Sequence, residues 1–313
     1  MSQALIKESS ATLRRTAEQD RHRIAIDSPS TDSVKLFVQI PCLNEAESIA
    51  ATIQGIPKAL DGVTVSIVVI DDGSTDQTQS IARAAGANHV IVHKANEGLA
   101  SAFRTGLETC LKRGPDVIVN LDGDNQYSAA DIPRLIEPIL DGTADIVVGD
   151  RRPGSNREFS WIKRRLECLG SRLVGLILGQ PTPDAVSGFR AFSRKAAIKL
   201  SVESTFSYTI ETLLQAKVKR LAVAWVVVRT HPVARPSRLA RSIPEFVVRS
   251  GVVIARTYYR HYPLRVFFSL GVAFLGNRSR GGAMIFQIDL DMDRGFRPQG
   301  SYEQAKTTSR TAA

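Results

Sequence analysis

The chain has 313 residues, of which 43% are hydrophobic and 23% charged, and its formal net charge at pH 7 is +10. This length and composition predict a globular protein with one generous α/β domain and appendages, and they exclude a chain too polar to fold. The N-terminus lacks the apolar core of a secretion signal, and the longest apolar run (266–275) is about half the ~20 residues that a membrane-spanning helix needs. The three cysteines have neither metal-ligand nor disulfide spacing, so we expect a reducing, cytoplasmic compartment.

The first half of the chain has a regular βα rhythm after a polar start. Residues 1–33 are poorly periodic and predict a disordered extension. The expected strands that follow are 36–40, 66–70, 89–93, 116–121 and 145–149. Strands that alternate with helices of about ten to fifteen residues predict a mostly parallel sheet with right-handed crossovers.

Helix starts in this half are marked by a polar residue followed three positions later by an acid or amide, the pattern of a capping box. The pairs are Asn44 with Glu47, Ser74 with Gln77, and Ser128 with Asp131. A further helix is expected from about Gly98 to Lys112.

The second half of the chain is less regular. Leucine and isoleucine spacing predicts a helix over 161–178, and SGFRAF (187–192) predicts an antiparallel strand followed by a helix from Ser193. The remaining expected elements are a helix over 208–217, a buried strand over 221–228 and an arginine-rich amphipathic helix over 243–262.

These elements divide the chain into four parts: the disordered extension (1–33), an α/β domain (34–235), a basic helix (236–265), and an apolar stub with an irregular tail (266–313). Eight arginines stand against one acid, Glu245, between positions 229 and 265. Such a stripe suits phosphates or an anionic membrane surface. We expect a protein that binds the cytoplasmic membrane face peripherally. The stub begins like a membrane span and then turns polar, which suggests a truncated or frame-shifted end, or a natural form without the span.

Two apolar runs end in paired aspartates, VSIVVIDDGSTD (65–76) and VIVNLDGD (117–124). Each run reads as a buried parallel strand that carries carboxylates to the edge of an open sheet, where such folds bind ligands. Carboxylates this close repel one another unless a cation or hydrogen-bond donors offset the charge. The pattern therefore predicts a nucleotide site and a metal site. The first βα turn has neither the glycines of a dinucleotide-binding turn nor a P-loop.

Six motifs follow one another along the chain: Pro41-x-x-Asn44-Glu45, Asp71-Asp72-Gly73-Ser74-x-Asp76, Asn96-x-Gly98, Asp122-x-Asp124-x-Gln126, Gly149-x-Arg151 and Ser187-Gly188-Phe189-Arg190. This ordered set resembles a family 2 glycosyltransferase of the GT-A fold, and is most similar to the dolichol-phosphate mannosyltransferase and polyprenyl-phosphate glycosyltransferase branch. The resemblance covers roughly residues 36–265. It implies an α/β fold with a mostly parallel sheet, flanking helices and a C-terminal basic amphipathic helix.

The resemblance also implies a set of site residues. The nucleotide-sugar pocket would use Pro41, Leu43, Glu45, Ile70, Asp72, Asp122 and Gly123. A Mg²⁺ or Mn²⁺ ion would be held by Asp122, Asp124 and Gln126. The catalytic group would be Asp124, Arg151 and Arg238.

The resemblance assigns only some of the phosphate-binding arginines. Arg151 matches a family arginine at the diphosphate or acceptor phosphate, and Arg238 replaces a family lysine by position. The arginine that precedes it has two candidates, Arg229 and Arg235. Asp184, Ser187 and Arg190 lie in a stretch near the acceptor, where structural and substrate roles both stay open.

The expected reaction is inverting transfer of a sugar from a UDP- or GDP-linked donor to polyprenyl or dolichyl phosphate. A phosphate monoester has its second pKa near ~6 and needs no general base. A sugar hydroxyl would need one, and Asp184 and Glu211 are then the candidates. The alternatives are a soluble glycan or protein acceptor, or an impaired nucleotide-sugar-binding remnant. A nucleic-acid partner explains the charge but not the aspartates, and the donor base, the sugar and the oligomeric state stay open.

Overall fold

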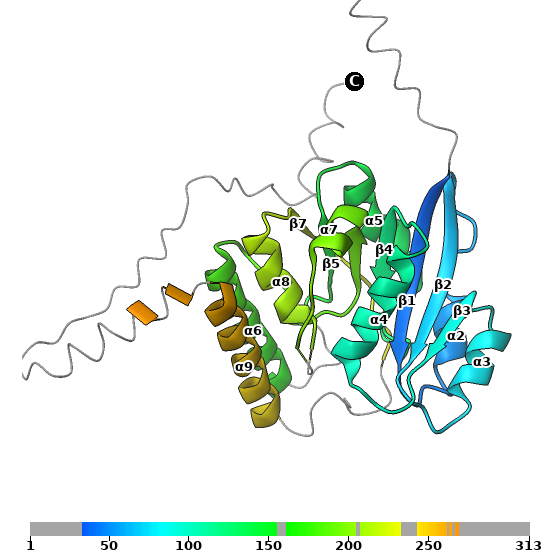
Figure 1. The fold of residues 1–313 in the computed structure, drawn as a ribbon, viewed down its shortest axis with the longest axis horizontal. Helices are drawn as coiled ribbons and strands as arrows, with labels where there is room; N and C mark the ends of the chain where they lie inside the picture. Colours follow the sequence, from blue (N-terminus) through cyan, green and yellow to red (C-terminus); the bar gives the residue numbers. More distant parts are fainter. Residues whose placement is uncertain are drawn as a thin grey trace, which may run out of the picture. The chain divides into compact units, whose positions relative to one another are not determined.

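The computed structural model describes residues 33–154, 161–204, 207–232, 243–261, 263–264 and 267–268. This part of the chain forms a seven-stranded sheet of order β3-β2-β1-β4-β6-β5-β7 (Figure 1). The strands are β1 (Val34–Cys42), β2 (Val63–Asp71), β3 (His89–Val92), β4 (Val117–Asn120), β5 (Ile146–Asp150), β6 (Arg190–Ser193) and β7 (Val223–Val227). Strand β6 runs antiparallel between β4 and β5, whereas β4 pairs with β1, β3 with β2 and β7 with β5 in parallel. The predicted α/β fold with a mostly parallel sheet is confirmed.

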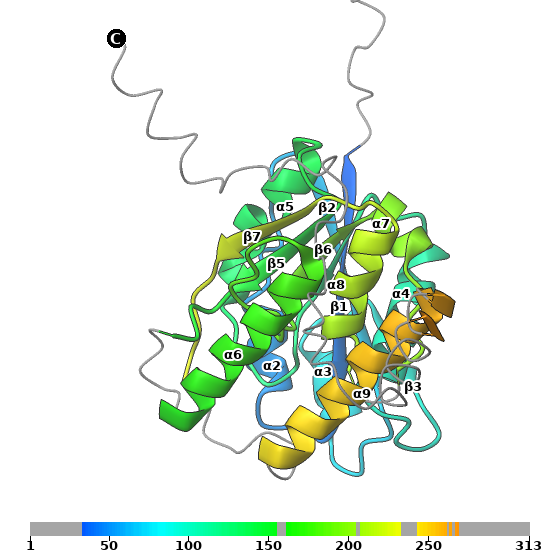
Figure 2. The same ribbon diagram turned by 90° about the vertical axis from the view of Figure 1, so that its left-hand side faces the viewer.

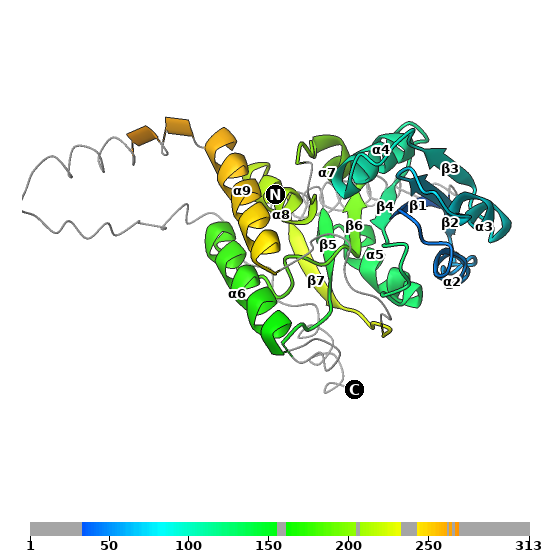
Figure 3. The same ribbon diagram turned by 90° about the horizontal axis from the view of Figure 1, so that it is seen from below.

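Helices cover both faces of the sheet (Figure 3). They are α2 (Ile49–Gln54), α3 (Thr78–Ala84), α4 (Leu99–Leu111), α5 (Ile132–Leu140), α6 (Trp161–Leu178), α7 (Arg194–Lys199), α8 (Thr209–Val218) and α9 (Ile243–His261), with a 3-10 turn η1 (Ala129–Asp131). Helices α4 and α7 lie on one face, and α2 and α5 on the other. Helix α8 packs against both α6 and α9 (Figure 2).

Covering both faces explains why the strands are almost continuously apolar. All four residues of β4 are buried, because alternate side chains enter the two helix layers. On the α4 side, the ring of Phe103 stacks on Tyr208 with centroids 3.9 Å apart and meets Phe192 edge-on at 5.7 Å. Strand β7 lies at the edge of the sheet, so the predicted buried strand is only half-buried.

The predicted capping box at Asn44 and Glu47 is wrong. Asn44 has a φ of 52°, and its side-chain oxygen accepts a hydrogen bond from Thr75 N at 2.8 Å. Helix α2 begins only at Ile49, and its N-cap Ser48 makes no side-chain cap. The asparagine joins two turns at the carboxyl edge of the sheet instead of starting a helix.

Two other predicted helix starts are displaced for a similar reason. Helix α3 begins at Thr78, and Ser74 instead donates to the Asp71 carboxylate. Helix α5 begins at Ile132 after η1, and Asp131 pairs with Arg229 across the chain. By contrast, the predicted start at Ser193 is confirmed, since its hydroxyl accepts from Ala196 N at 3.1 Å.

The predicted amphipathic C-terminal helix is present as α9 (Ile243–His261). Val253 and Thr257 are buried on its inner side, while Val248, Val252 and Tyr259 are exposed. None of the helices in the described part of the chain is both long and apolar enough to cross a bilayer. The predicted disordered extension and most of the predicted tail lie outside the described residues.

Candidate active site

The predicted donor-binding residues gather at the carboxyl edge of the central strands. The ends of β1 and β2 are joined by a hydrogen bond from Asp72 N to Cys42 O of 2.9 Å. Strand β4 is in register with β1, with Asn120 opposite Gln39, so the turn that follows it opens at the same edge. This is the place where open α/β sheets bind their ligands.

The first acidic cluster is well supplied with hydrogen-bond donors. Asp71 is fully buried and accepts from Ser74 N at 3.3 Å, from the Ser74 hydroxyl, and from Gln79 Nε2 at 2.8 Å. Ionised carboxylates are stable in a protein interior when such donors are present. Asp71 therefore fixes the turn into α3.

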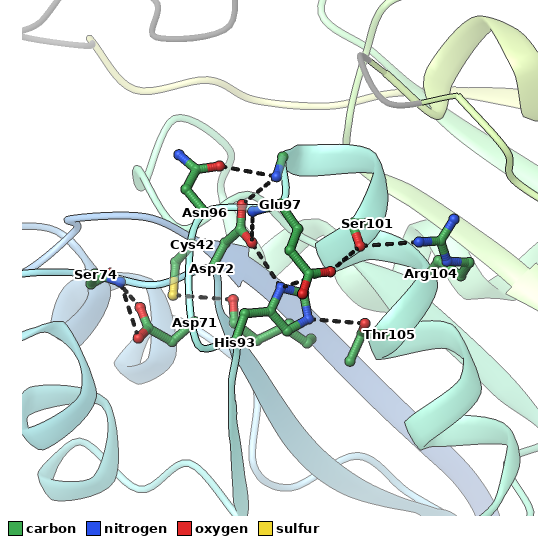
Figure 4. Close-up of polar contacts among 12 residues, drawn as sticks. Cys42, Asp71, Asp72, Ser74, His93, Asn96, Glu97, Ser101, Arg104 and Thr105 are labelled. Atoms are coloured by element: carbon green, nitrogen blue, oxygen red, sulfur yellow. Dashed lines mark hydrogen bonds and ion pairs between the residues drawn. The ribbon is translucent and has the colours of Figure 1, made fainter.

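Asp72 anchors the turn between β3 and α4, as Figure 4 shows. Its Oδ1 accepts from His93 Nδ1 at 2.7 Å and from Glu97 N at 2.9 Å, and its Oδ2 accepts from Gly98 N at 2.8 Å. The other ring nitrogen of His93 meets Thr105 Oγ1 at 3.0 Å. Sequence reasoning missed His93, although it is the last residue of the predicted strand 89–93, next to the strand that precedes Asp72.

The remaining donor-pocket residues lie on the turn after β1. Pro41 is buried at the end of that strand, and Leu43 is half-buried. The Glu45 carboxylate accepts from Ser48 Oγ at 2.8 Å, and the same hydroxyl lies 2.9 Å from Gly123 O. This hydroxyl brings the turn after β1 against the turn after β4.

Gly123 is required for that close approach. A Cβ added there would lie 3.0 Å from Cys42 Cβ and 3.4 Å from Glu45 Cγ. The Cys42 thiol is buried beside Asp71 and Glu45, and burial raises its pKa. The glycine thus lets Asp122 and Asp124 lie beside Glu45.

The second acidic cluster lacks donors of this kind. Within the described residues no hydrogen bond reaches the Asp122 carboxylate, while Asp124 accepts one from Gln126 N at 3.0 Å. Burial, together with the nearby Asp124 charge, raises the pKa of Asp122 to about 7. Arg151 and Arg190 act in the opposite direction without overcoming this effect. The cluster is short of positive charge.

Gly188 lies directly behind the Asp122 carboxylate. A Cβ at this position would come within 2.7 Å of Asp122 Oδ1 and still closer to Oδ2. Its N–H donates to Tyr127 OH at 3.1 Å, and its carbonyl accepts from Asn120 Nδ2 at 3.0 Å and Tyr208 OH at 3.1 Å. Sequence reasoning missed these three supports, and the one available signal was a polar Asn120 that ends an apolar strand.

The turn after Asp124 pairs with the chain that follows β7. His231 N donates to Gln126 O at 2.7 Å, and Ser128 N donates to Arg229 O at 3.0 Å. The Arg229 guanidinium binds the Asp131 carboxylate with a closest distance of 2.8 Å. Arg229 is therefore engaged by an acid, while Arg235 and Arg238 lie outside the described residues.

Arg151 is held by two acids. Its Nε and NH2 bind the two oxygens of buried Asp184 at 2.7 and 2.9 Å, and NH2 also lies 3.2 Å from Glu167 Oε2 on α6. Burial lowers the pKa of Arg151, but Tyr127 and these two carboxylates raise it further, so the net shift is upward. The arginine is fixed in one orientation at the end of β5.

Arg190 has a structural set of contacts. It is fully buried and donates to the carbonyls of Ser187, Thr209 and Ala185 at 2.8, 2.6 and 2.8 Å. Burial lowers its pKa to about 10. The side chain joins the turn before β6 to the start of α8.

The side chains around the second acidic cluster fit a hard divalent cation. Asp122 and Asp124 offer carboxylate oxygens and Gln126 an amide oxygen, which are the ligand types that Mg²⁺ and Mn²⁺ prefer. Burial, and then the neighbouring Asp124 charge, raise the pKa of Asp122, so bound positive charge would favour its ionised form. Among the described residues no three carboxylate, imidazole or thiolate side chains converge on one point, so diphosphate oxygens would have to complete the shell.

Comparison with known proteins assigns the fold and the enzyme class. Residues 37–201 match the family model described as glycosyl transferase family 2. The chain belongs to this family. It is a glycosyltransferase of the GT-A fold, as the sequence predicted.

Several relatives of this glycosyltransferase carry names that mention lipid phosphates. It is 32% identical over 253 residues to Glycosyltransferase AglJ of Haloferax volcanii, with 78% of both chains covered. It is 29% identical to the undecaprenyl-phosphate mannosyltransferase of Micrococcus luteus, with 60% of this chain and 79% of the relative covered. The UDP-N-acetylglucosamine–dolichyl-phosphate N-acetylglucosaminyltransferase of Methanococcus voltae is 28% identical, with 62% and 85% covered.

A solved structure supports the same fold. Glucosyl-3-phosphoglycerate synthase from Mycobacterium tuberculosis, in complex with phosphoglyceric acid, superimposes with a TM-score of 0.54 and 26% identity. The match covers 72% of this chain and 80% of that structure.

Proposed function

We propose that this glycosyltransferase moves a sugar, with inversion, from a nucleoside diphosphate sugar to a polyprenyl phosphate, with a divalent metal ion bound at Asp122, Asp124 and Gln126. One observation carries the proposal. Two carboxylates without a cationic partner lie at the ligand-binding edge of the sheet, in the turn that abuts Glu45. A cation and the diphosphate that accompanies it would satisfy both.

The donor would lie across the ends of β1, β2 and β4. Pro41 and Leu43 would form the wall against the base, and Asp72 would accept a hydrogen bond from it. Solved relatives of the same fold contain Mn²⁺ together with UDP or UDP-glucose, which supports this arrangement. The Asp122 and Asp124 carboxylates would hold the metal, which neutralises charge on the departing diphosphate when bound.

The contacts of two buried carboxylates bear on the choice of acceptor. Both oxygens of Asp184 bind Arg151, and Glu211 accepts from Glu203 N at 3.0 Å and Ser204 N at 2.9 Å. The two carboxylates that the sequence suggested as general bases therefore already accept hydrogen bonds from the protein. A phosphate acceptor, which needs no base, agrees with these contacts and with the names of three relatives.

Arg151, which matches a family arginine at a phosphate, would receive a phosphate while two acids hold it. Its guanidinium keeps a fixed direction because Asp184 and Glu167 hold it. An arginine restrained in this way loses little conformational entropy when it binds an anion. Arg238 would add a second positive charge from the segment that follows Pro232.

The test is transfer by the purified full-length chain to undecaprenyl phosphate in detergent micelles. Radiolabelled UDP-glucose, UDP-N-acetylglucosamine and GDP-mannose are supplied with Mn²⁺ or Mg²⁺, and the extracted lipid is counted. We expect a labelled lipid product that chelation with EDTA abolishes, with the opposite anomeric configuration to the donor by NMR. Equal transfer with EDTA would contradict the proposed metal role.

Other acceptors give distinct results in the same experiment. Label that enters a soluble glycan or protein and never the lipid would favour the alternative acceptor class. Metal-dependent UDP or GDP binding without transfer to any acceptor would favour a disabled nucleotide-sugar-binding protein.

A soluble phosphorylated acid is a second candidate acceptor. The similarity to glucosyl-3-phosphoglycerate synthase, solved with phosphoglyceric acid, favours it. Competition separates the two: unlabelled 3-phosphoglycerate should leave lipid labelling unchanged, and a labelled phosphoglycerate product would overturn the lipid assignment.

We also propose peripheral attachment to a membrane surface through α6 and α9. Three leucines on one side of α6, Leu169, Leu173 and Leu176, are exposed. Arg165 and Arg172 are exposed beside them. Apolar side chains flanked by arginines are typical of helices that lie in the headgroup region of anionic bilayers.

Liposome co-sedimentation tests this attachment. Leu173→Glu should reduce binding to phosphatidylglycerol liposomes several-fold. The matched control is Ile198→Glu, which changes an exposed apolar side chain on α7 and should leave binding unchanged. Equal loss in both variants would contradict a specific role for α6.

A further inference from the structure

The Asp72 carboxylate has most of its hydrogen-bonding capacity already in use. Oδ1 receives two donors, His93 Nδ1 and Glu97 N, and Oδ2 receives Gly98 N (Figure 4). An ionised carboxylate offers about four acceptor positions, two on each oxygen. Among the described residues, Oδ2 thus accepts one hydrogen bond and keeps one further acceptor position.

The carboxylate cannot easily turn to present a different edge. A Cβ on Gly73 would lie 2.7 Å from the carbonyl carbon of Ala95, so the turns after β2 and β3 are in tight backbone contact. His93 is buried and held from its far side by Thr105 Oγ1 at 3.0 Å. Because Asp72 only accepts in these contacts, Nδ1 carries the proton that fixes Oδ1.

Pyrimidine and purine bases make different demands on such a group. Uracil presents a single ring N–H, at N3. Guanine presents two adjacent donors, N1–H and the exocyclic N2 amino group, which a carboxylate would normally accept with both oxygens. With Oδ1 already saturated, the second guanine donor would be buried without a partner.

We propose that the donor pocket is selective for a uracil base, and that His93 is the positioning residue that creates this selectivity by occupying Oδ1 of Asp72. The inference rests on the proposed function, in which Asp72 contacts the base. The names of the relatives do not decide the base, since they include both mannosyltransferases and a UDP-N-acetylglucosamine enzyme.

Inosine diphosphate provides the sharpest probe. Hypoxanthine has the size of guanine and keeps N1–H but lacks the N2 amino group. If the number of free acceptor positions on Asp72 determines which base binds, inosine diphosphate should bind about tenfold more tightly than GDP. This ratio is equivalent to 1.4 kcal/mol. UDP should bind more tightly than both, and CDP should bind weakly because its N3 is an acceptor that would face Oδ2.

The experiment is isothermal titration of the full-length chain with each of the four nucleotides in saturating Mn²⁺. GDP affinity equal to or above that of inosine diphosphate overturns the inference while leaving metal-dependent nucleotide binding, and so the proposed function, intact. If none of the four nucleotides binds in a metal-dependent way, the proposed function itself fails.

Variants of His93 test the positioning role through the ratio of affinities. His93→Ala frees a position on Oδ1, so the preference for inosine diphosphate over GDP should fall from about tenfold towards onefold. His93→Asn places an amide N–H where Nδ1 lies and should restore the preference. His89→Ala, at the start of the strand that His93 follows and opposite Val68, is the matched control and should keep the preference.

A role for His93 in stability alone would lower both affinities together and leave their ratio unchanged, which would overturn the positioning role. Thermal unfolding of each variant is measured alongside. If His93→Ala does not fold, the ratio in the unaltered chain and in His93→Asn still decides the inference.

Discussion

The two acidic clusters have the same sequence pattern but opposite electrostatic surroundings. Asp71 and Asp72 end β2 and together receive six hydrogen bonds, from Ser74 (two), Gln79, His93, Glu97 and Gly98. Asp122 and Asp124 follow β4, and within the described residues they receive one, from Gln126 N. Protein donors supply most of the hydrogen bonds that the first cluster can accept, whereas they supply a single one to the second.

This difference shows how one strand-end pattern can serve two purposes. A carboxylate satisfied by protein donors orders the turns that shape a pocket. A carboxylate left without them has a raised pKa and is costly until a cation binds. The two roles predict opposite effects of substitution, and the variants that follow test this from the largest expected effect to the smallest.

Asp124→Asn should have the largest effect. Loss of a carboxylate from the proposed metal site should reduce the transfer rate at least ~100-fold, because charge on the leaving diphosphate is no longer offset. Steady-state transfer to undecaprenyl phosphate measures it, and Asp61→Asn, an exposed aspartate, is the control. A variant that transfers sugar at the native rate would refute the metal site.

Gly188→Ala should reduce transfer about tenfold or more, with little loss of stability. The added methyl group would displace the Asp122 carboxylate. Gly170→Ala on α6 is the control, because its Cβ would meet nothing within 4 Å. That change should keep full activity and stabilise the helix by about 0.5–1 kcal/mol in urea unfolding. Equal activity of the two variants would show that Gly188 does not position Asp122.

Asp71→Asn should destabilise the fold by about 1–3 kcal/mol, because an amide group replaces an oxygen that buried donors require. Urea unfolding without metal measures the change. A variant as stable as the parent chain would mean that the first cluster does not order its turn.

Asp122→Asn should instead raise the free energy of unfolding, by a smaller amount. We expect about 1–2 kcal/mol at pH 8, after allowance for the partial exposure of the side chain. The ordinary pKa of aspartate is about 4, and that of Asp122 is raised to about 7. The folded protein therefore retains a proton there that the unfolded chain releases. The stability that this retained proton contributes is fully present below about pH 4 and is lost as the pH rises through 7.

The gain from Asp122→Asn should accordingly be larger at pH 8 than at pH 5. Addition of Mn²⁺ should stabilise the parent chain at pH 8 and leave the variant unchanged. Destabilisation by this substitution at pH 8 without metal would contradict the contrast between the clusters.

Much of the fold could be predicted because local patterns set it. The spacing of leucines and isoleucines gave the limits of α6 at 161 and 178, as observed. The same spacing did not reveal that Leu169 and Leu173 are exposed while Val174 and Leu178 are buried. Helical spacing alone does not indicate which of two apolar stripes faces the core.

Helix starts were harder to predict because polar residues near the carboxyl edge have competing partners. Asn44, Ser74 and Asp131 belong to the predicted capping boxes, yet each side chain binds a group from another turn. Those partners lie as far as 98 residues away along the chain. Tertiary contacts at a binding edge thus outweigh local capping preferences.

The gathering of the two acidic turns at one edge could be predicted, because carboxyl ends of parallel strands meet there. The supporting contacts of the site could not be. Asn120 reaches Tyr208 across 88 residues, and His93 reaches Asp72 across 21. Such pairs become visible only when the strand order is known.

Helix α6 connects the proposed active site with the surface of the molecule. Glu167, which holds Arg151, and Leu169, which faces solvent, are two positions apart and thus on opposite sides of the same helix. If binding of the leucines to a bilayer displaces α6, the Glu167 carboxylate moves with the helix, and the Arg151 guanidinium that it orients shifts as well. Sugar transfer by this enzyme should then respond to lipid composition even when acceptor concentration is held constant.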